Sequence, residues 1–94
     1  MTNTILYTVL LEYKGGTYIS QVRAESPLDA ITKWSTNLLD EDLNAWDLRR
    51  DELLSVIESD SLVSVTDCLN VWCNSGIDAD GEQILLNIVA TIDD

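Results

Sequence analysis

The chain contains 94 residues, with seventeen acidic and five basic side chains and no histidine, so its formal net charge is −12. A charge of this size argues against nucleic acid or an anionic membrane as a partner, and it favours either simple solvation or attraction to a basic protein. The sequence shows neither a membrane-spanning apolar run nor a basic N-terminal leader, so we expect one cytoplasmic domain covering residues 1–94.

The segment 5–24 is predicted to form a β-hairpin. Two runs rich in Val, Ile, Leu, Tyr and Thr flank Gly15-Gly16, and glycines adopt the positive φ angles of a primed two-residue turn without steric cost. This turn would pair Tyr13 with Tyr18, Leu11 with Ser20, Val9 with Val22 and Tyr7 with Ala24. Because side chains alternate along a strand, these residues are predicted to share one face of the sheet.

A helix is predicted to begin at Ser26. Ser26 would be the N-cap, Pro27 the first helical residue, and Asp29 the acid that completes a capping box. On a helical projection, the core-facing side comprises Leu28, Ile31, Trp34, Ser35, Leu38 and Leu39. Asp29 and Lys33 would form an ion pair on the solvent side.

The acidic run at residues 40–42 suits the first turn of a second helix, because carboxylates are favourable at the positive end of the helix dipole. A second apolar stripe follows it, made of Leu43, Trp46, Leu53, Leu54 and Ile57. Arg50 projects into the middle of this stripe. Either the chain breaks near Asp47, which would cap a new helix, or Arg50 extends past the stripe toward Asp47 or another acid. We favour the break.

The rest of the chain is predicted to add a short edge strand at residues 62–65 and a second hairpin. Its strands would span 69–77 and 83–92, joined by a turn at residues 78–81. The predicted core positions are Val71, Cys73 and Ile77 on the first strand and Ile84, Leu86, Ile88 and Ala90 on the second. The element order predicts an α+β domain, β-β-α-α-β-β, with one antiparallel sheet from two hairpins packed against two helices.

This arrangement leaves a second face of the sheet to be covered. Its predicted apolar residues are Leu6, Leu10, Ile19, Trp72, Leu85 and Val89. A contiguous apolar surface of this kind favours a homodimer or another partner contact. The alternatives are that the two helices cover opposite faces of the sheet, or that the strand register differs by one residue.

Catalytic chemistry is not expected. Besides the missing histidine, Cys68 and Cys73 have no further cysteine near them, and Lys14 and Lys33 are predicted in a turn and on a solvated helix face. The acids within residues 78–82 do not have the spacing of an EF-hand loop. We therefore predict a non-enzymatic protein that needs no metal or cofactor, with both cysteines as free thiols.

In its size and acidity the chain resembles the immunity proteins that neutralise bacterial toxins, without a shared motif. The resemblance implies an inhibitor whose carboxylates occupy a basic site on a partner protein, and ten acids follow Arg50 without a single base. The predicted binding residues are Asp40, Glu41, Asp42, Trp46, Asp47, Asp51 and Glu52. Trp46 would be either an aromatic anchor or a core residue. The alternative function is a small homodimeric assembly protein that associates through the open sheet face.

Overall fold

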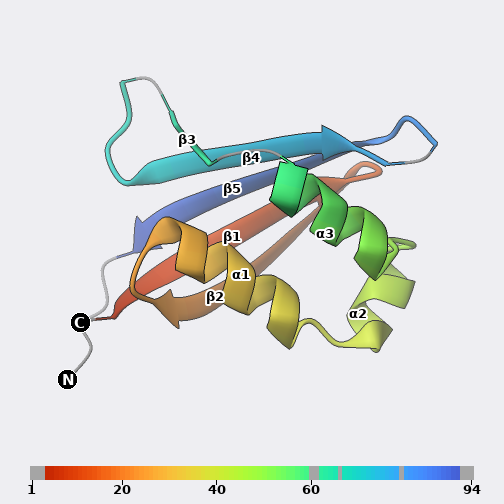
Figure 1. Cartoon of the computed structure of the whole chain (residues 1–94), viewed down its shortest axis with the longest axis horizontal. Coiled ribbons are helices and arrows are strands. Elements are labelled where there is room, and N and C mark those ends of the chain that lie inside the picture. The colour runs from red at the N-terminus through yellow and green to blue at the C-terminus, as the bar shows by residue number, and fades with distance from the viewer. Residues whose placement is uncertain (1–3, 60–61, 66, 79, 92–94) are drawn as a thin grey trace.

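The computed structural model describes residues 4–59, 62–65, 67–78 and 80–91, and it shows one antiparallel sheet with helices packed against it (Figure 1). The elements are β1 (Ile5–Tyr13), β2 (Gly16–Ala24), α1 (Pro27–Asn37), α2 (Asp40–Ala45), α3 (Arg50–Ser59), β3 (Val63–Ser64), β4 (Val71–Ile77) and β5 (Gln83–Thr91). The strand order is β2-β1-β5-β4-β3. The predicted α+β fold is confirmed; the third helix results from the break predicted near Asp47, and β3 lies within the edge strand predicted at residues 62–65. Two predicted positions, Ala79 in the turn and Ile92 at the end of the last strand, lie outside the described residues.

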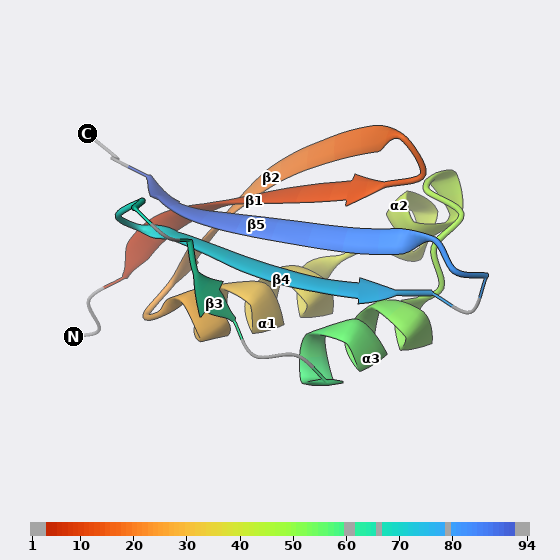
Figure 2. The same ribbon diagram turned by 90° about the horizontal axis from the view of Figure 1, so that it is seen from above.

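The helices and the sheet form two layers. Figure 2 shows α1 and α3 beneath one face of the sheet, and α2 near the end where β1 turns into β2. The core lies between the layers and contains Tyr7, Val9, Leu11 and Tyr13 of β1, Ile84, Leu86 and Ile88 of β5, Ala30, Ile31 and Trp34 of α1, and Leu53 of α3. Among the described residues, no helix has the length and apolar character needed to cross a bilayer.

The first hairpin forms, but its predicted register was wrong by two residues. The turn is Lys14-Gly15, with φ angles of 49° and 80°, so Tyr13 pairs with Gly16 and Leu11 with Tyr18. Gly16 serves another purpose, because a Cβ at this position would come within 2.6 Å of the Tyr18 hydroxyl. A shift of two residues preserves the alternation of side chains, so the predicted faces of both strands are correct.

The start of α1 confirms Ser26 as the N-cap and Pro27 as the first helical residue, but Asp29 bonds to the N–H of Glu25 and not to that of the N-cap, so the capping box is not reciprocal. The Ser26 hydroxyl accepts the Asp29 N–H at 3.0 Å, and the Asp29 carboxylate accepts the Glu25 N–H at 3.0 Å and contacts Lys33 at 3.2 Å. The hydrogen bond from Glu25 is the main reason that the pKa of Asp29 is lowered. Part of the predicted apolar side was wrong. Leu28 and Leu39 are 62% and 60% exposed; the helix ends at Asn37, so Leu39 lies beyond its periodicity.

The predicted break near Asp47 is confirmed. Asp47 has a φ of 55° and lies in the connection between α2 and α3, so it turns the chain and does not cap α3. Arg50 reaches past the apolar stripe to the acid Asp40, at 3.2 Å, as the alternative allowed, and it also bonds to the end of α1. Its guanidinium donates to the carbonyl oxygens of Ser35 at 3.0 Å and Leu38 at 2.6 Å, at the end of α1. It therefore satisfies carbonyl groups that lack helical partners.

In β4 the predicted core face was wrong by one residue. Trp72 pairs with Ile88 and Asn74 with Leu86, so these two side chains face the helices, whereas Val71, Cys73 and Ile77 face the other way. Ile77 is 68% exposed. Trp72 packs against the core and contacts the ring of Tyr7 edge-on, with centroids 6.1 Å apart. The core positions predicted on β5 are correct: Ile84, Leu86 and Ile88 are buried, and Ala90 packs against them.

Candidate functional site

The sheet face turned away from the helices is the largest candidate surface, and we call it the open face. Its members follow from the registers: Leu6, Thr8, Leu10 and Glu12 of β1, Thr17, Ile19, Gln21 and Arg23 of β2, Val63 of β3, Val71, Cys73, Ser75 and Ile77 of β4, and Gln83, Leu85, Asn87, Val89 and Thr91 of β5. None of the described helices covers it (Figure 2). Glu12 and Arg23 are its charged residues, so its formal net charge is zero.

Apolar side chains lie next to one another across the strands of the open face. Leu10 pairs with Ile19, and Val71 pairs with Val89. Ile19 is 65% exposed, and Ile77 at the far corner is 68% exposed. Within each pair the Cβ atoms are about 5 Å apart, and Leu10 of the first pair is a diagonal neighbour of Val89 of the second, because Leu10 pairs with Asn87.

The polar residues of the open face bond to each other. The hydroxyl oxygens of Thr8 and Thr91 are 2.6 Å apart, and the Gln21 amide donates to Thr8 at 3.1 Å. These contacts use part of the hydrogen-bonding capacity of the three side chains within the face itself. The face can therefore lose water at a lower cost than a surface of unbonded polar groups.

Five of the six residues predicted for a dimer face lie on the open face: Leu6, Leu10, Ile19, Leu85 and Val89. Trp72 does not, because it faces the core. The sequence reasoning missed Val71, Cys73 and Ile77, since β4 was assigned the opposite face, and it assigned no face to Val63 of β3. The pairing of Trp72 with Ile88 would have revealed the error, but a register between strands is not visible in the sequence.

The predicted acidic site lies on α2, α3 and the connection between them, and three of its carboxylates contact bases of the chain itself. Asp40 is 3.2 Å from Arg50, Asp47 is 2.8 Å from Lys14, and Asp51 is 3.3 Å from Arg49. The site has six carboxylates, those of Asp40, Glu41, Asp42, Asp47, Asp51 and Glu52. With three bases among them, its formal charge is 3 − 6 = −3, a quarter of the total. The acidity is therefore not concentrated here.

Trp46, the predicted anchor of that site, is half-buried. Its ring stacks on Tyr18 of β2, with centroids 4.8 Å apart and planes inclined by 28°, and it packs against the core. This contact ties α2 to the edge of the sheet. It agrees with the core alternative for Trp46.

A buried polar contact that the sequence did not predict joins the two hairpins. The Tyr13 hydroxyl donates to Asp78, which is 7% exposed and also accepts the N–H groups of Asp80 and Glu82 at 2.9 Å each. Burial, followed by the contact with Asp78, raises the pKa of Tyr13 to about 12, and the Tyr13 hydrogen bond is the main reason that the pKa of Asp78 is lowered. Three donors bind this carboxylate, so it holds the β4–β5 turn.

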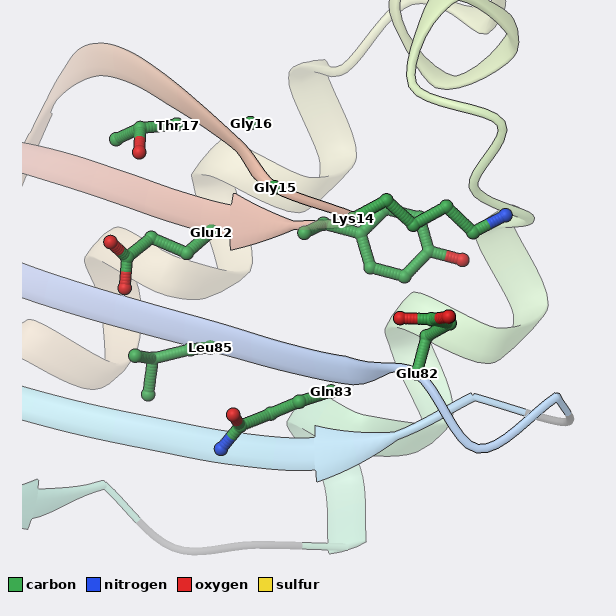
Figure 3. A pocket seen from close by; sticks show the side chains of 9 residues that line it. Glu12, Lys14, Gly15, Gly16, Thr17, Glu82, Gln83 and Leu85 are labelled. Carbon is green, nitrogen blue, oxygen red and sulfur yellow. The ribbon is translucent and has the colours of Figure 1, made fainter.

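Beside this contact lies a hollow of about 600 Å³, shown in Figure 3. Its lining includes Glu12, Lys14, Thr17, Glu82 and Leu85. The bond to Asp47 raises the pKa of Lys14, so the amine is held in its charged form, which is not nucleophilic. Among the described residues, no group of three or more acidic or cysteine side chains is arranged to hold a metal ion, and Cys68 and Cys73 are free thiols.

No protein-family model, curated protein or solved structure matches the chain.

Proposed function

We propose that the chain is a non-catalytic protein-binding domain that associates with a second copy of itself through the open face. The observation that carries this proposal is the contrast between the open face and the rest of the molecule. The open face has one acid, Glu12, and one base, Arg23, whereas the whole chain has a net charge of −12. The other charged residues that the structure describes lie in helices, turns and connections.

This distribution of charge suits a second copy. Two chains of charge −12 repel each other when their acidic surfaces approach, but contact through neutral faces keeps those surfaces apart. A strongly basic partner would gain little from this face, because the carboxylates that would attract it lie elsewhere. Apolar contact between like faces is thus the association that the charge distribution favours.

The size of the open face is sufficient when most of it takes part. Four long strands about 4.8 Å apart, each spanning seven to nine residues of about 3.3 Å, cover roughly 500 Å² before the relief of the side chains is counted. A standard interface removes about 800 Å² of accessible surface per partner. Two such sheets would pack about 10 Å apart, as in a β-sandwich.

Val89→Glu tests the dimer, because Val89 lies between Thr8 and Val71 near the middle of the open face. Sedimentation of the native protein should show a concentration-dependent dimer, and the variant should be a monomer. Leu28→Glu is the matched control, since Leu28 is 62% exposed on α1 and should leave the dimer unchanged. A native chain that stays monomeric at millimolar concentration would refute the proposal.

A second candidate function is the inhibitor of a basic protein, with the acidic site as its contact surface. The supporting observation is that Asp40, Asp47 and Asp51 are 71–88% exposed in their ion pairs. Exposed ion pairs contribute roughly 0–1 kcal/mol each, so a partner's basic side chains could replace those of Lys14, Arg49 and Arg50. This candidate requires salt-sensitive association, whereas the sheet-face dimer does not.

A further inference from the structure

The outer edge of β2 is a second surface whose features point to a ligand. β2 is the last strand on its side of the sheet, runs for nine residues without proline, and has Arg23 as its charged residue (Figure 1). The opposite edge is formed by β3, which has two residues. Natural sheets usually protect an edge by shortness, charge, proline or a bulge, and β2 has few of these features.

The backbone groups that β2 directs outward can be assigned from one backbone hydrogen bond of β5 and from the strand registers. The Ala90 N–H donates to the Asn70 carbonyl, so even-numbered residues of β5 bond toward β4. The N–H and C=O of one residue point to the same side in an antiparallel ladder, and successive residues point to opposite sides. Odd-numbered residues of β5 therefore bond to even-numbered residues of β1, and odd-numbered residues of β1 bond to β2. Even-numbered residues of β2 bond to β1. The outward residues that the proposal uses are Thr17, Ile19 and Gln21.

A small hollow lies along this edge. It has a volume of about 190 Å³ and is lined by Ser20, Gln21, Val22, Trp34, Asn37, Leu38 and Asp42. Three consecutive residues of β2 line it although their side chains alternate between the two faces, so the hollow follows the outer edge of the strand. The Trp34 indole donates to the Ser20 hydroxyl at 2.8 Å, which fixes one wall of the hollow.

We propose that the β2 edge binds an extended segment of a basic protein as an added strand. Main-chain hydrogen bonds to the outward residues supply affinity, and one apolar side chain enters the hollow against Val22, Trp34 and Leu38. A lysine or arginine of the segment lies beside Asp42, and the charge of −12 attracts the segment from solution. This proposal does not depend on the dimer, because it uses the edge of the sheet and not its open face.

Hydrogen exchange followed by NMR tests the proposal with a short peptide of alternating leucine and lysine. In the free protein, the amide protons of Ile19 and Gln21 should exchange fast, whereas those of Tyr18, Ser20 and Val22 should be protected by β1. Added peptide should protect the outward residues. The proposal is wrong if the peptide leaves them unprotected, or if they are already protected in the free protein at high concentration, which would place a second copy on this edge.

Two substitutions separate the backbone contact from the charge contact. Gln21→Pro removes an outward N–H and leaves the ladder to β1 intact, so it should weaken peptide binding roughly 3- to 10-fold relative to Gln21→Ala. Asp42→Asn should lower the affinity for the leucine–lysine peptide roughly 2- to 5-fold and leave the affinity for a leucine–glutamine peptide unchanged. Equal affinity of the Pro and Ala variants, with exchange protection of α1 retained in both, would overturn the added-strand geometry.

Discussion

Arg50 is predicted to hold the end of α1 against α3, and Arg50→Met tests this role. Methionine retains most of the apolar stem but loses the guanidinium, which leaves the Ser35 and Leu38 carbonyl oxygens without their donor. A hydrogen bond to a charged donor contributes about 1.5–3 kcal/mol when buried. The Arg50 side chain is 35% exposed, so we reduce this to about 1 kcal/mol for each of the two bonds. The contact with Asp40, which is 88% exposed, adds little.

The expected loss in the free energy of unfolding is therefore about 2 kcal/mol, equivalent to a fall in Tm of roughly 8–16 °C for a domain of this size. Urea unfolding at neutral pH, followed by tryptophan fluorescence and circular dichroism, measures it. Arg49→Met is the matched control, because the Arg49 side chain is 73% exposed and contacts Asp51 at 3.3 Å, so the loss should stay below about 0.5 kcal/mol. Equal losses in the two variants would refute the assigned role of Arg50.

Two further predictions concern charge. The pKa of Tyr13 is raised to about 12 from its ordinary value of 10.0, so its contribution to stability is complete below pH 10 and is lost as pH rises toward 12. The lowered pKa of Asp78 acts in the opposite range: its contribution is present above about pH 4 and is lost as pH falls further. Urea unfolding measured across pH should show the free energy of unfolding falling at both the acid and the alkaline end. Tyr13→Phe should reduce the fall at the alkaline end. An unchanged alkaline fall in this variant would contradict the role assigned to Tyr13. Neutralising residues 40–42 as Asn, Gln and Asn should slow association with a basic partner captured at low salt several-fold, and this difference should shrink as salt rises. An association rate that does not change with salt concentration would contradict the function as an inhibitor of a basic protein.

Some parts of the candidate surfaces could be predicted from the sequence. The alternation of apolar residues in β1, β2 and β5 placed Leu10, Ile19 and Val89 on the open face, because each strand has a strict period of two. The acidic residues of the second candidate were equally visible. Their ion pairs were not, since Lys14 and Asp47 are far apart in the chain and meet through the packing of the α2–α3 connection against the first hairpin.

Features that depend on residues close together in the chain could be predicted from the sequence. Ser26, Pro27 and Asp29 define the start of α1 because a helix cap is made within four residues. The conflict between Arg50 and the apolar stripe indicated the break between α2 and α3 because one helix cannot place both on the same side. These signals act through local sterics and hydrogen bonds, so no distant contact was needed to interpret them.

The tertiary structure decided the features that depend on pairing between distant segments. In the first hairpin, either Lys14-Gly15 or Gly15-Gly16 satisfies a primed turn, and the folded chain adopts the former, with Tyr13 paired with Gly16 and the Tyr18 ring beside Gly16. In β4, the apolar residues Val71 and Trp72 compete for the core, and pairing with β5 turns Trp72 inward. The neutrality of the open face arises in the same way. A net charge is a property of the sequence, but its absence from one face is set by strand order and register, which place the acids elsewhere.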